Sequence, residues 1–163
     1  MTDTSSVPDA TAKKTVSLVI SVWNRKEDLR ENLATISQQT VPADQVIVVD
    51  NDSSDGTPEM VIAEFPEVQL IRMPHSNYGA CETFNVGFSS AKGDFVGILD
   101  DDVILPVTFV EDMINKFAAE PDTTAILSPK VIEPEMPEWY LASEAIHRER
   151  YLPTFRGCGS MAR

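Results

Sequence analysis

The sequence predicts an α/β fold, with a mostly parallel sheet flanked by helices. Short β-branched runs alternate with longer amphipathic segments from about residue 16 to residue 128. Turns rich in Asn, Asp, Ser and Gly separate these segments. Strands that alternate with helices build parallel sheets covered on both faces. Such sheets bind ligands beyond the carboxyl ends of their strands, and polar clusters follow several of the predicted strands here.

The predicted strands are apolar runs bounded by turn residues. The first is rich in Val and Ile and ends at a Ser-Val-Trp-Asn-Arg sequence. The second ends at Asp50, and the fourth ends just before three consecutive aspartates. We expect strands at residues 16–22, 45–50, 68–72, 95–99 and 124–128.

The predicted helices lie between these strands and carry apolar side chains at helical spacing. Asn24 is expected to cap the first helix, with Glu27 completing a capping box. Asn77 is expected to cap the third helix, and prolines open the second and the fourth. The expected helices comprise residues 26–39, a short segment from Pro58, residues 78–91 and residues 106–119.

The chain divides into three predicted regions. Residues 1–14 are polar and are expected to form a flexible leader. Residues 15–130 form the α/β domain. Residues 131–163 contain repeated prolines and an expected short helix at 141–150, and they end in a segment that resembles the beginning of an element. We interpret this last region as incomplete, so the fold is expected to be truncated at its C-terminus.

Composition restricts the partners of the chain. A formal net charge of −13 argues against nucleic acid and against an anionic membrane as general partners. It permits an anionic small ligand, since a bound divalent cation inverts the local field. Cys81 and Cys158 match neither a zinc pattern nor a disulfide scaffold. No transmembrane segment or signal peptide is expected, which predicts a cytoplasmic protein, with peripheral association at the inner face of the membrane left open.

Three consecutive aspartates, Asp100, Asp101 and Asp102, follow the fourth predicted strand and precede Pro106. Carboxylates this close repel one another unless a cation or hydrogen-bond donors offset the charge. Hard cations such as Mg²⁺ and Mn²⁺ prefer oxygen ligands and often share them with phosphates. The alternative is a solvated acidic turn that caps the next helix.

Two further clusters follow the first and second strands. Asp50 ends a buried strand and could accept hydrogen bonds from a base or a ribose, although residues 51–56 also fit an ordinary Asx-rich turn. Trp23 could stack on a base, and Arg25 could bind a phosphate through two hydrogen bonds. The alternative for this pair is a helix start beside an ordinary surface arginine.

A fourth motif surrounds the start of the third predicted helix. Asn77 and Asn85 could line a nucleotide cleft there. The accompanying glycines, Gly79 and Gly87, more simply allow close packing of the helix on the sheet.

Together these motifs resemble the nucleotide-sugar-binding half of family 2 glycosyltransferases, which have the GT-A fold. The matching pieces, which cover residues 15 to about 130, are Val16-Ser-Leu-Val-Ile-Ser-Val-Trp-Asn-Arg25, Ile47-Val-Val-Asp-Asn-Asp-Ser-Ser-Asp-Gly-Thr57, Asn77-Tyr-Gly through Asn85-Val-Gly87, and Asp100-Asp-Asp-Val-Ile-Leu-Pro106.

The resemblance implies transfer of a sugar, with inversion, from a UDP- or dTDP-linked donor to a glycan or lipid-linked acceptor in cell-wall or polysaccharide biosynthesis. It implies that Asp50 reads the base and that Ser21 and Trp23 line its pocket. The aspartates correspond to the Asp-x-Asp motif of the family, which binds Mg²⁺ or Mn²⁺. Asp102 is then the direct metal ligand, and Asp100 or Asp101 contacts the ribose or a metal-bound water. The remaining substrate-binding candidates are Asn24, Arg25, Asn51, Asp52, Asn77 and Asn85.

The resemblance leaves the catalytic base unassigned, because in the family it lies beyond a segment that residues 155–163 resemble. Two rival functions are considered. A non-catalytic nucleotide-sugar-binding module would show binding without turnover. A phosphatase or receiver domain needs an aspartate after the first strand, where this chain has Ser21-Val-Trp23.

Overall fold

The computed structural model describes residues 13–133, 137–138 and 158–163. They form a sheet of six strands in the order β3-β2-β1-β4-β6-β5. Strands β1 to β4 are parallel, whereas β6 runs antiparallel between β4 and β5. This confirms the predicted α/β class with a mostly parallel sheet. The strands are β1 (Val16–Val22), β2 (Gln45–Asp50), β3 (Gln69–Arg72), β4 (Phe95–Leu99), β5 (Ile126–Leu127) and β6 (Ser160–Ala162).

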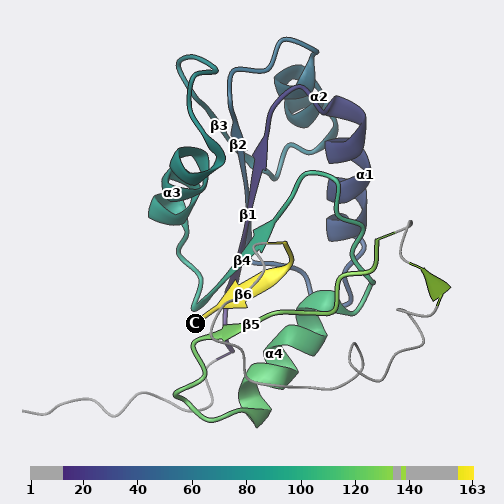
Figure 1. Cartoon of the computed structure of the whole chain (residues 1–163), viewed down its shortest axis with the longest axis vertical. Helices are drawn as coiled ribbons and strands as arrows, with labels where there is room; N and C mark the ends of the chain where they lie inside the picture. The colour runs from purple at the N-terminus through teal and green to yellow at the C-terminus, as the bar shows by residue number, and fades with distance from the viewer. Residues whose placement is uncertain (1–12, 134–136, 139–157) are drawn as a thin grey trace, which may run out of the picture.

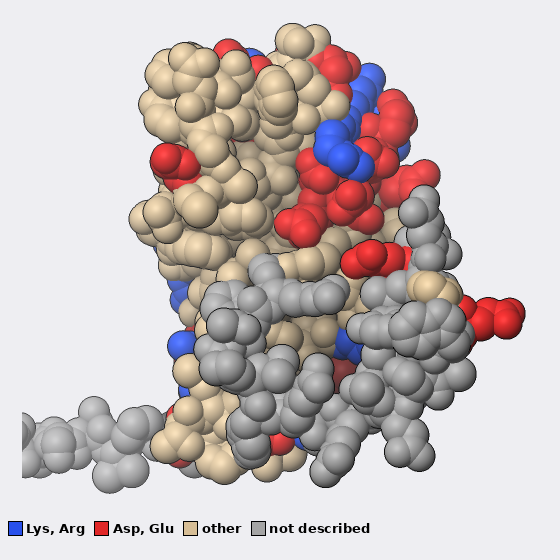
Figure 2. All heavy atoms as spheres, viewed as in Figure 1, with Lys and Arg blue, Asp and Glu red and all other residues tan. Residues whose placement is uncertain are grey.

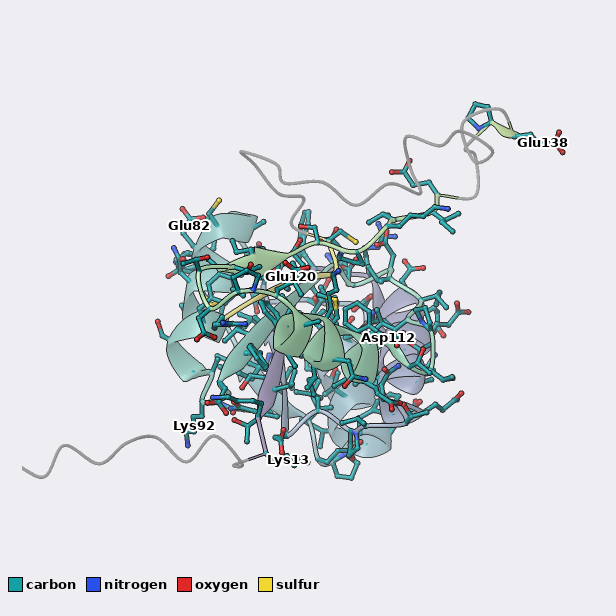
Figure 3. All side chains as sticks on the ribbon, turned by 90° about the horizontal axis from the view of Figure 1, so that it is seen from below. Lys13, Glu82, Lys92, Asp112, Glu120 and Glu138 are labelled. Atoms are coloured by element: carbon teal, nitrogen blue, oxygen red, sulfur yellow. The ribbon has the colours of Figure 1, made fainter. Side chains whose placement is uncertain are left out.

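Helices cover both faces of the sheet (Figure 1). Helix α3 packs on one face against β1 and β2, and the other face carries the remaining helices. In the view from below, α4 lies across the sheet between Asp112 and Glu120 (Figure 3). The helices are α1 (Lys26–Ser37), α2 (Thr57–Glu64), α3 (Ala80–Ser90) and α4 (Phe109–Ala119).

Strand β1 is buried on both faces, as expected of a central parallel strand. Its side chains alternate between two cores. Leu18 and Ile20 join the larger core with α1, α2 and α4, whereas Val19 joins the smaller core under α3. Gly87 of α3 lies directly over Val19, where a Cβ would overlap the valine methyl group. The close approach predicted for this glycine is therefore observed.

The prediction that Asn24 caps α1 is wrong. Asn24 has a positive φ of 53°, and its side-chain oxygen accepts a hydrogen bond from the backbone of Ser54 at 2.8 Å. The cap comes instead from Asp55, whose carboxylate accepts from the backbone N–H of Lys26 at 3.0 Å. The same carboxylate accepts from the backbone N–H of Thr57 at 3.0 Å, so it caps the start of α2 as well.

The prediction that Asn77 caps α3 is also wrong. This helix begins at Ala80, after Gly79, with no side-chain hydrogen bond at its cap. Helix α4 begins at Phe109 rather than Pro106, because residues 106–109 form a turn closed by the backbone N–H of Phe109 and the carbonyl of Pro106. Strand β6 was not predicted.

Two predicted segments lie outside the described residues. They are the helix expected at 141–150 and most of the leader, residues 1–12. Lys13 and Lys14, at its end, pair with Asp44 and Asp94. Among the described residues no helix is long and apolar enough to cross a membrane.

Candidate functional site

A cleft of about 330 Å³ opens at the carboxyl ends of β1, β2 and β4. We call it the carboxyl-edge cleft. Its walls come from the end of β1 and the loop after it, the end of β2, the start of α3 and the loop after β4. The lining residues are Ser21, Val22, Trp23, Arg25, Asn51, Tyr78, Ala80, Thr83 and Asp101.

Asn51 lines this cleft and has a buried side-chain oxygen that meets no hydrogen-bond donor among the described residues. Its side chain is held by donation from Nδ2 to the carbonyl of Tyr78 at 2.9 Å and, more weakly, to that of Ser76 at 3.5 Å. Because carbonyls only accept, this contact fixes which end of the amide is oxygen. Oδ1 is buried and has no partner in the part of the chain that the structure describes, and the residue is 8% exposed. A buried acceptor without a partner is costly, which makes Oδ1 a candidate to accept a hydrogen bond from a ligand N–H or O–H.

Ser21 and Thr83 form the floor on the α3 side, with their hydroxyl oxygens 2.6 Å apart. Thr83 has one hydroxyl proton and donates it to the carbonyl of Ala80 at 2.9 Å. Ser21 therefore donates to Thr83, which leaves the lone pairs of the Ser21 oxygen as acceptors.

Asp50 lies beneath the cleft rather than on its surface. It is fully buried, and its carboxylate accepts hydrogen bonds from the backbone N–H of Ser53 at 3.2 and 3.3 Å. Arg72, which neighbours it in register on β3, pairs with it at 3.5 Å and with Asp52 at 3.6 Å. In this structure Asp50 shapes the loop that carries Asn51.

The loop between β4 and α4, residues 100–108, carries the three aspartates, and we call it the acidic loop. It is anchored on α1. Asn32 donates from Nδ2 to the carbonyl of Val103 at 2.6 Å, and Gln39 donates to the carbonyl of Pro106 at 2.8 Å. The hydroxyl of Thr35 accepts from the backbone N–H of Leu105 at 3.2 Å. These contacts hold the later part of the loop, residues 103–106, against α1 and the residues that follow it.

Arg25 meets the aspartates across the mouth of the cleft. Its Nε lies 3.4 Å from Asp101 Oδ1, and its NH2 lies 3.2 Å from Asp102 Oδ2. Asp28, one turn along α1, also accepts from Arg25 Nε at 2.9 Å. Figure 2 shows acidic side chains gathered beside α1, with Lys and Arg side chains among them.

The carboxylate of Asp101 is the least exposed of this group, at 14%. Burial raises its pKa to about 6; Arg25 opposes this effect, and the charges of Asp102, Asp28 and Asp100 add to it. Asp100 is exposed and lies against Cys158, whose thiol pKa is raised to about 11 by burial and by that carboxylate.

The donor set suits a hard cation. Asp101 and Asp102 already converge on one positive group, the Arg25 guanidinium. No cluster of at least three His, Cys, Asp or Glu side chains able to hold a metal ion is found in the described part of the chain. Mg²⁺ and Mn²⁺ sites of the kind that bind nucleotides do not need one, because one or two carboxylates act there with phosphate oxygens and water.

A second hollow, of about 310 Å³, lies at the opposite edge of the sheet beside Ser17, Gln45 and Lys92. Here the polar groups satisfy one another. The Ser17 hydroxyl donates to Gln45 Oε1 at 2.7 Å and accepts from the backbone N–H of Lys92 and Gly93. In Figure 3 Lys92 and Lys13 lie on the side of the molecule opposite Glu82 of α3. The unpaired acceptor of Asn51 and the acidic loop both favour the carboxyl-edge cleft.

Comparison with known proteins agrees with this architecture. The model of the family described as "Glycosyl transferase family 2" matches residues 17–160. The chain belongs to this family. A glycosyltransferase of Haemophilus influenzae described as uncharacterized is 31% identical over 118 residues, covering 72% of this chain and 40% of that protein. The chondroitin synthase of Escherichia coli is 28% identical over 118 residues, covering 71% of this chain and 17% of that protein.

A solved structure of a glycosyltransferase has a similar fold. The mannosyltransferase PcManGT from Pyrobaculum calidifontis, in complex with GDP-Man and Mn²⁺, superposes with a TM-score of 0.73 at 25% identity. The match covers 96% of this chain and 46% of that one. This family 2 chain therefore spans less than half the length of these relatives.

The structure brings only some of the predicted site residues of this family 2 chain to the carboxyl-edge cleft. Those that line it are Ser21, Trp23, Arg25, Asn51 and Asp101. The others do not line it: Asp50 lies below the cleft, Asn24, Asp52 and Asn77 lie in exposed loops, Asn85 lies on the exposed side of α3, and Asp100 and Asp102 lie on the acidic loop.

Sequence reasoning missed Tyr78, Ala80, Thr83 and Arg72. Ala80 and Thr83 are three residues apart at the start of α3, so they share the helix face that meets β1. Arg72 is the last residue of β3, and Asp50 is the last residue of β2. Because parallel strands end at the same edge of a sheet, the positions of these two residues could have indicated their contact.

Proposed function

We propose that this family 2 chain forms the donor-binding part of a metal-assisted, inverting glycosyltransferase. The donor is a UDP- or dTDP-linked sugar, and the acceptor is a hydroxyl of a glycan or of a lipid-linked glycan. Membership of the family supports the reaction class. The observation that carries the donor site is that one cleft is lined both by Asn51, whose Oδ1 has no partner among the described residues, and by Asp101.

The base-binding end of the proposed site lies between Trp23 and Tyr78. Trp23 is 55% exposed at the cleft, and the ring of Tyr78 is stacked on His75 with centroids 4.5 Å apart. Flat aromatic walls suit a nucleobase. The imide N–H of uracil or thymine is a single donor that Asn51 Oδ1 can accept. Asp50 supports this end from below through Ser53 and Arg72.

The diphosphate end of the proposed site is the acidic loop. Asp102 and Asp100 would hold Mg²⁺ or Mn²⁺ there, with Asp101 directed into the cleft. When bound, the ion supplies positive charge that stabilises the departing nucleoside diphosphate. The mannosyltransferase neighbour, solved in complex with GDP-Man and Mn²⁺, supports the use of a divalent metal with a nucleotide-sugar donor.

Inverting transfer also needs a general base for the acceptor hydroxyl. We assign this role to none of the described carboxylates. The chondroitin synthase relative supports a glycan acceptor. A lipid-linked acceptor would bring the chain to the inner face of the membrane.

Calorimetric titration of the 163-residue chain tests the donor site. UDP, dTDP and GDP are titrated with and without Mn²⁺ into the wild type, Asp102→Ala and the control Asp122→Ala, which removes an exposed aspartate outside the cleft. We expect Mn²⁺ to strengthen UDP or dTDP binding in the wild type and in the control but not in Asp102→Ala. A nucleotide affinity that changes neither when Mn²⁺ is left out nor when Asp102 is replaced would refute the proposed metal role.

The same titration tests the base-binding end. Asp50→Ala should weaken nucleotide binding in the absence of metal as well as in its presence, because the loop that carries Asn51 loses its support. An unchanged affinity would remove Asp50 from the base site.

A further inference from the structure

The guanidinium of Arg25 occupies the position of a cation between the loop after β1 and the loop after β4. It lies within 3.4 Å of Asp101 and 3.2 Å of Asp102. Both carboxylates belong to the loop that is proposed to bind the metal. One positive side chain therefore offsets, in this structure, part of the acidic charge, including that of Asp102, which the proposed metal would share with Asp100.

We propose that Arg25 is an exchangeable counter-cation: it holds Asp101 and Asp102 together before the metal binds, and it leaves them for the donor phosphates when the metal arrives. This inference rests on the proposed function, since it takes the acidic loop as the metal site. It assigns Arg25 a positioning role that couples metal binding to diphosphate binding.

The geometry allows this exchange with little disturbance of the fold. The backbone of Arg25 is fixed, because its carbonyl accepts from the N–H of Leu29 in the first turn of α1 at 3.0 Å. Its side chain is 46% exposed and lines the cleft. A rotation of the side chain alone can therefore move the guanidinium, while α1 and the acidic loop stay in place.

Charge explains the direction of the exchange. A divalent ion held by Asp102 and Asp100 would lie beside the guanidinium that contacts Asp102, and the two cations would repel each other. In this structure Nε of Arg25 also contacts Asp28 at 2.9 Å, so a further carboxylate is within reach of Arg25 when the metal takes Asp102. Its NH groups are then available to phosphate oxygens, which a guanidinium binds through two parallel hydrogen bonds.

Manganese binding without nucleotide is the first test. Free Mn²⁺ is followed by electron paramagnetic resonance while it is titrated into the wild type, Arg25→Gln and Arg30→Gln. Arg30 is the matched control, because it also lies on α1 and pairs with two carboxylates, Glu27 and Glu64, but it does not line the cleft. Each variant lacks one positive charge, so a difference between their Mn²⁺ affinities reports the effect of where that charge lies.

Removal of the competing cation should strengthen Mn²⁺ binding roughly three- to tenfold in Arg25→Gln relative to Arg30→Gln, the size expected for charges a few ångströms apart near the surface. With Mn²⁺ saturating, UDP should bind Arg25→Gln roughly tenfold more weakly, since a charge-assisted hydrogen bond is lost. Uridine, which has no phosphate, should bind both variants equally.

The outcomes separate this inference from the proposed function. If the wild type binds Mn²⁺ and UDP but Arg25→Gln binds Mn²⁺ no more tightly than Arg30→Gln, the exchange is refuted and the donor site stands. If the wild type binds neither, both are refuted. Circular dichroism checks folding. Should Arg25→Gln not fold, Arg25→Lys replaces it, with Arg30→Lys as its charge-matched control: the single ammonium group of Arg25→Lys cannot span both carboxylates, so Mn²⁺ binding should be tighter than in Arg30→Lys.

Discussion

The side-chain amide of Asn51 donates a hydrogen bond of 2.9 Å to the backbone carbonyl of Tyr78. This contact ties the end of β2 to the loop before α3 and turns Oδ1 of Asn51 away from that carbonyl. The oxygen is buried, and none of the residues that the structure describes donates a hydrogen bond to it. Asn51, which lines the cleft, therefore combines a structural bond with an acceptor that these residues leave unused.

Replacement of Asn51 by alanine should weaken UDP binding roughly tenfold, the loss expected for one hydrogen bond to a buried acceptor. Methylation of N3 of the uracil should weaken binding to the wild type by a similar factor. In Asn51→Ala the methyl group should have little further effect, because the two changes remove the same bond. Calorimetry with UDP and its N3-methyl derivative measures all four affinities.

Asn85→Ala provides the control for this experiment, because Asn85 lies on the exposed side of α3 and does not line the cleft. It should bind UDP like the wild type. A methylation penalty of equal size in the wild type and in Asn51→Ala would show that Asn51 does not contact the base.

Asp55 should matter for stability rather than for binding. Its carboxylate accepts hydrogen bonds from the backbone of Lys26 and of Thr57, at the starts of two helices. Asp55→Ala should lower the free energy of unfolding by about 1–2 kcal/mol, the usual cost of losing a helix cap. Urea denaturation measures the change, and a loss well below this range would mean that water replaces the cap at little cost.

The contribution of Asp55 should also depend on pH. Burial acts to raise its pKa, but hydrogen bonds from the Thr57 hydroxyl and from the two backbone amides outweigh it, so the pKa lies below 3.8. A carboxylate whose pKa is lowered on folding stabilises the fold at pH values above its ordinary, unfolded-state pKa. This stabilisation is lost as the pH falls through the folded-state pKa. The stability difference between wild type and Asp55→Asn should therefore shrink in acid. A difference independent of pH would contradict this prediction.

Gly87 should tolerate no side chain. A Cβ on this residue would overlap Cγ1 of Val19 and would lie 3.3 Å from Cγ2 of Val49. Both neighbours are β-branched, buried and unable to rotate freely. Gly87→Ala should destabilise the fold by about 1–3 kcal/mol, despite the better helix propensity of alanine. Thermal unfolding measures this, with Ser89→Ala on the exposed side of α3 as control; equal melting temperatures would refute the packing argument.

Local patterns predicted the strands well, because the runs that end at Val22, Asp50 and Leu99 are apolar and bounded by polar turns. Strand β6 escaped prediction. Its three residues, Ser160–Ala162, carry no periodic pattern, and its position depends on pairing with the distant strand β4. Such long-range pairing leaves no local signal.

The candidate site was predictable where residues directly follow strands, as for Trp23, Asn51 and Asp101. Caps were less predictable. Asn24 and Asn77 are typical capping residues, yet α1 is capped by Asp55 from a loop some thirty positions away. Thr83 resembles any residue of a helix until the contact of its hydroxyl with Ser21 is known.

The most direct test of the donor site is a crystal structure of the chain with UDP and Mn²⁺, with anomalous diffraction to locate the metal. We expect the Mn²⁺ peak at the carboxylates of Asp102 and Asp100, with the diphosphate beside it and the uracil N3 within hydrogen-bonding distance of Asn51 Oδ1. A peak elsewhere, or a nucleotide bound at the opposite edge of the sheet near Ser17 and Lys92, would contradict the account.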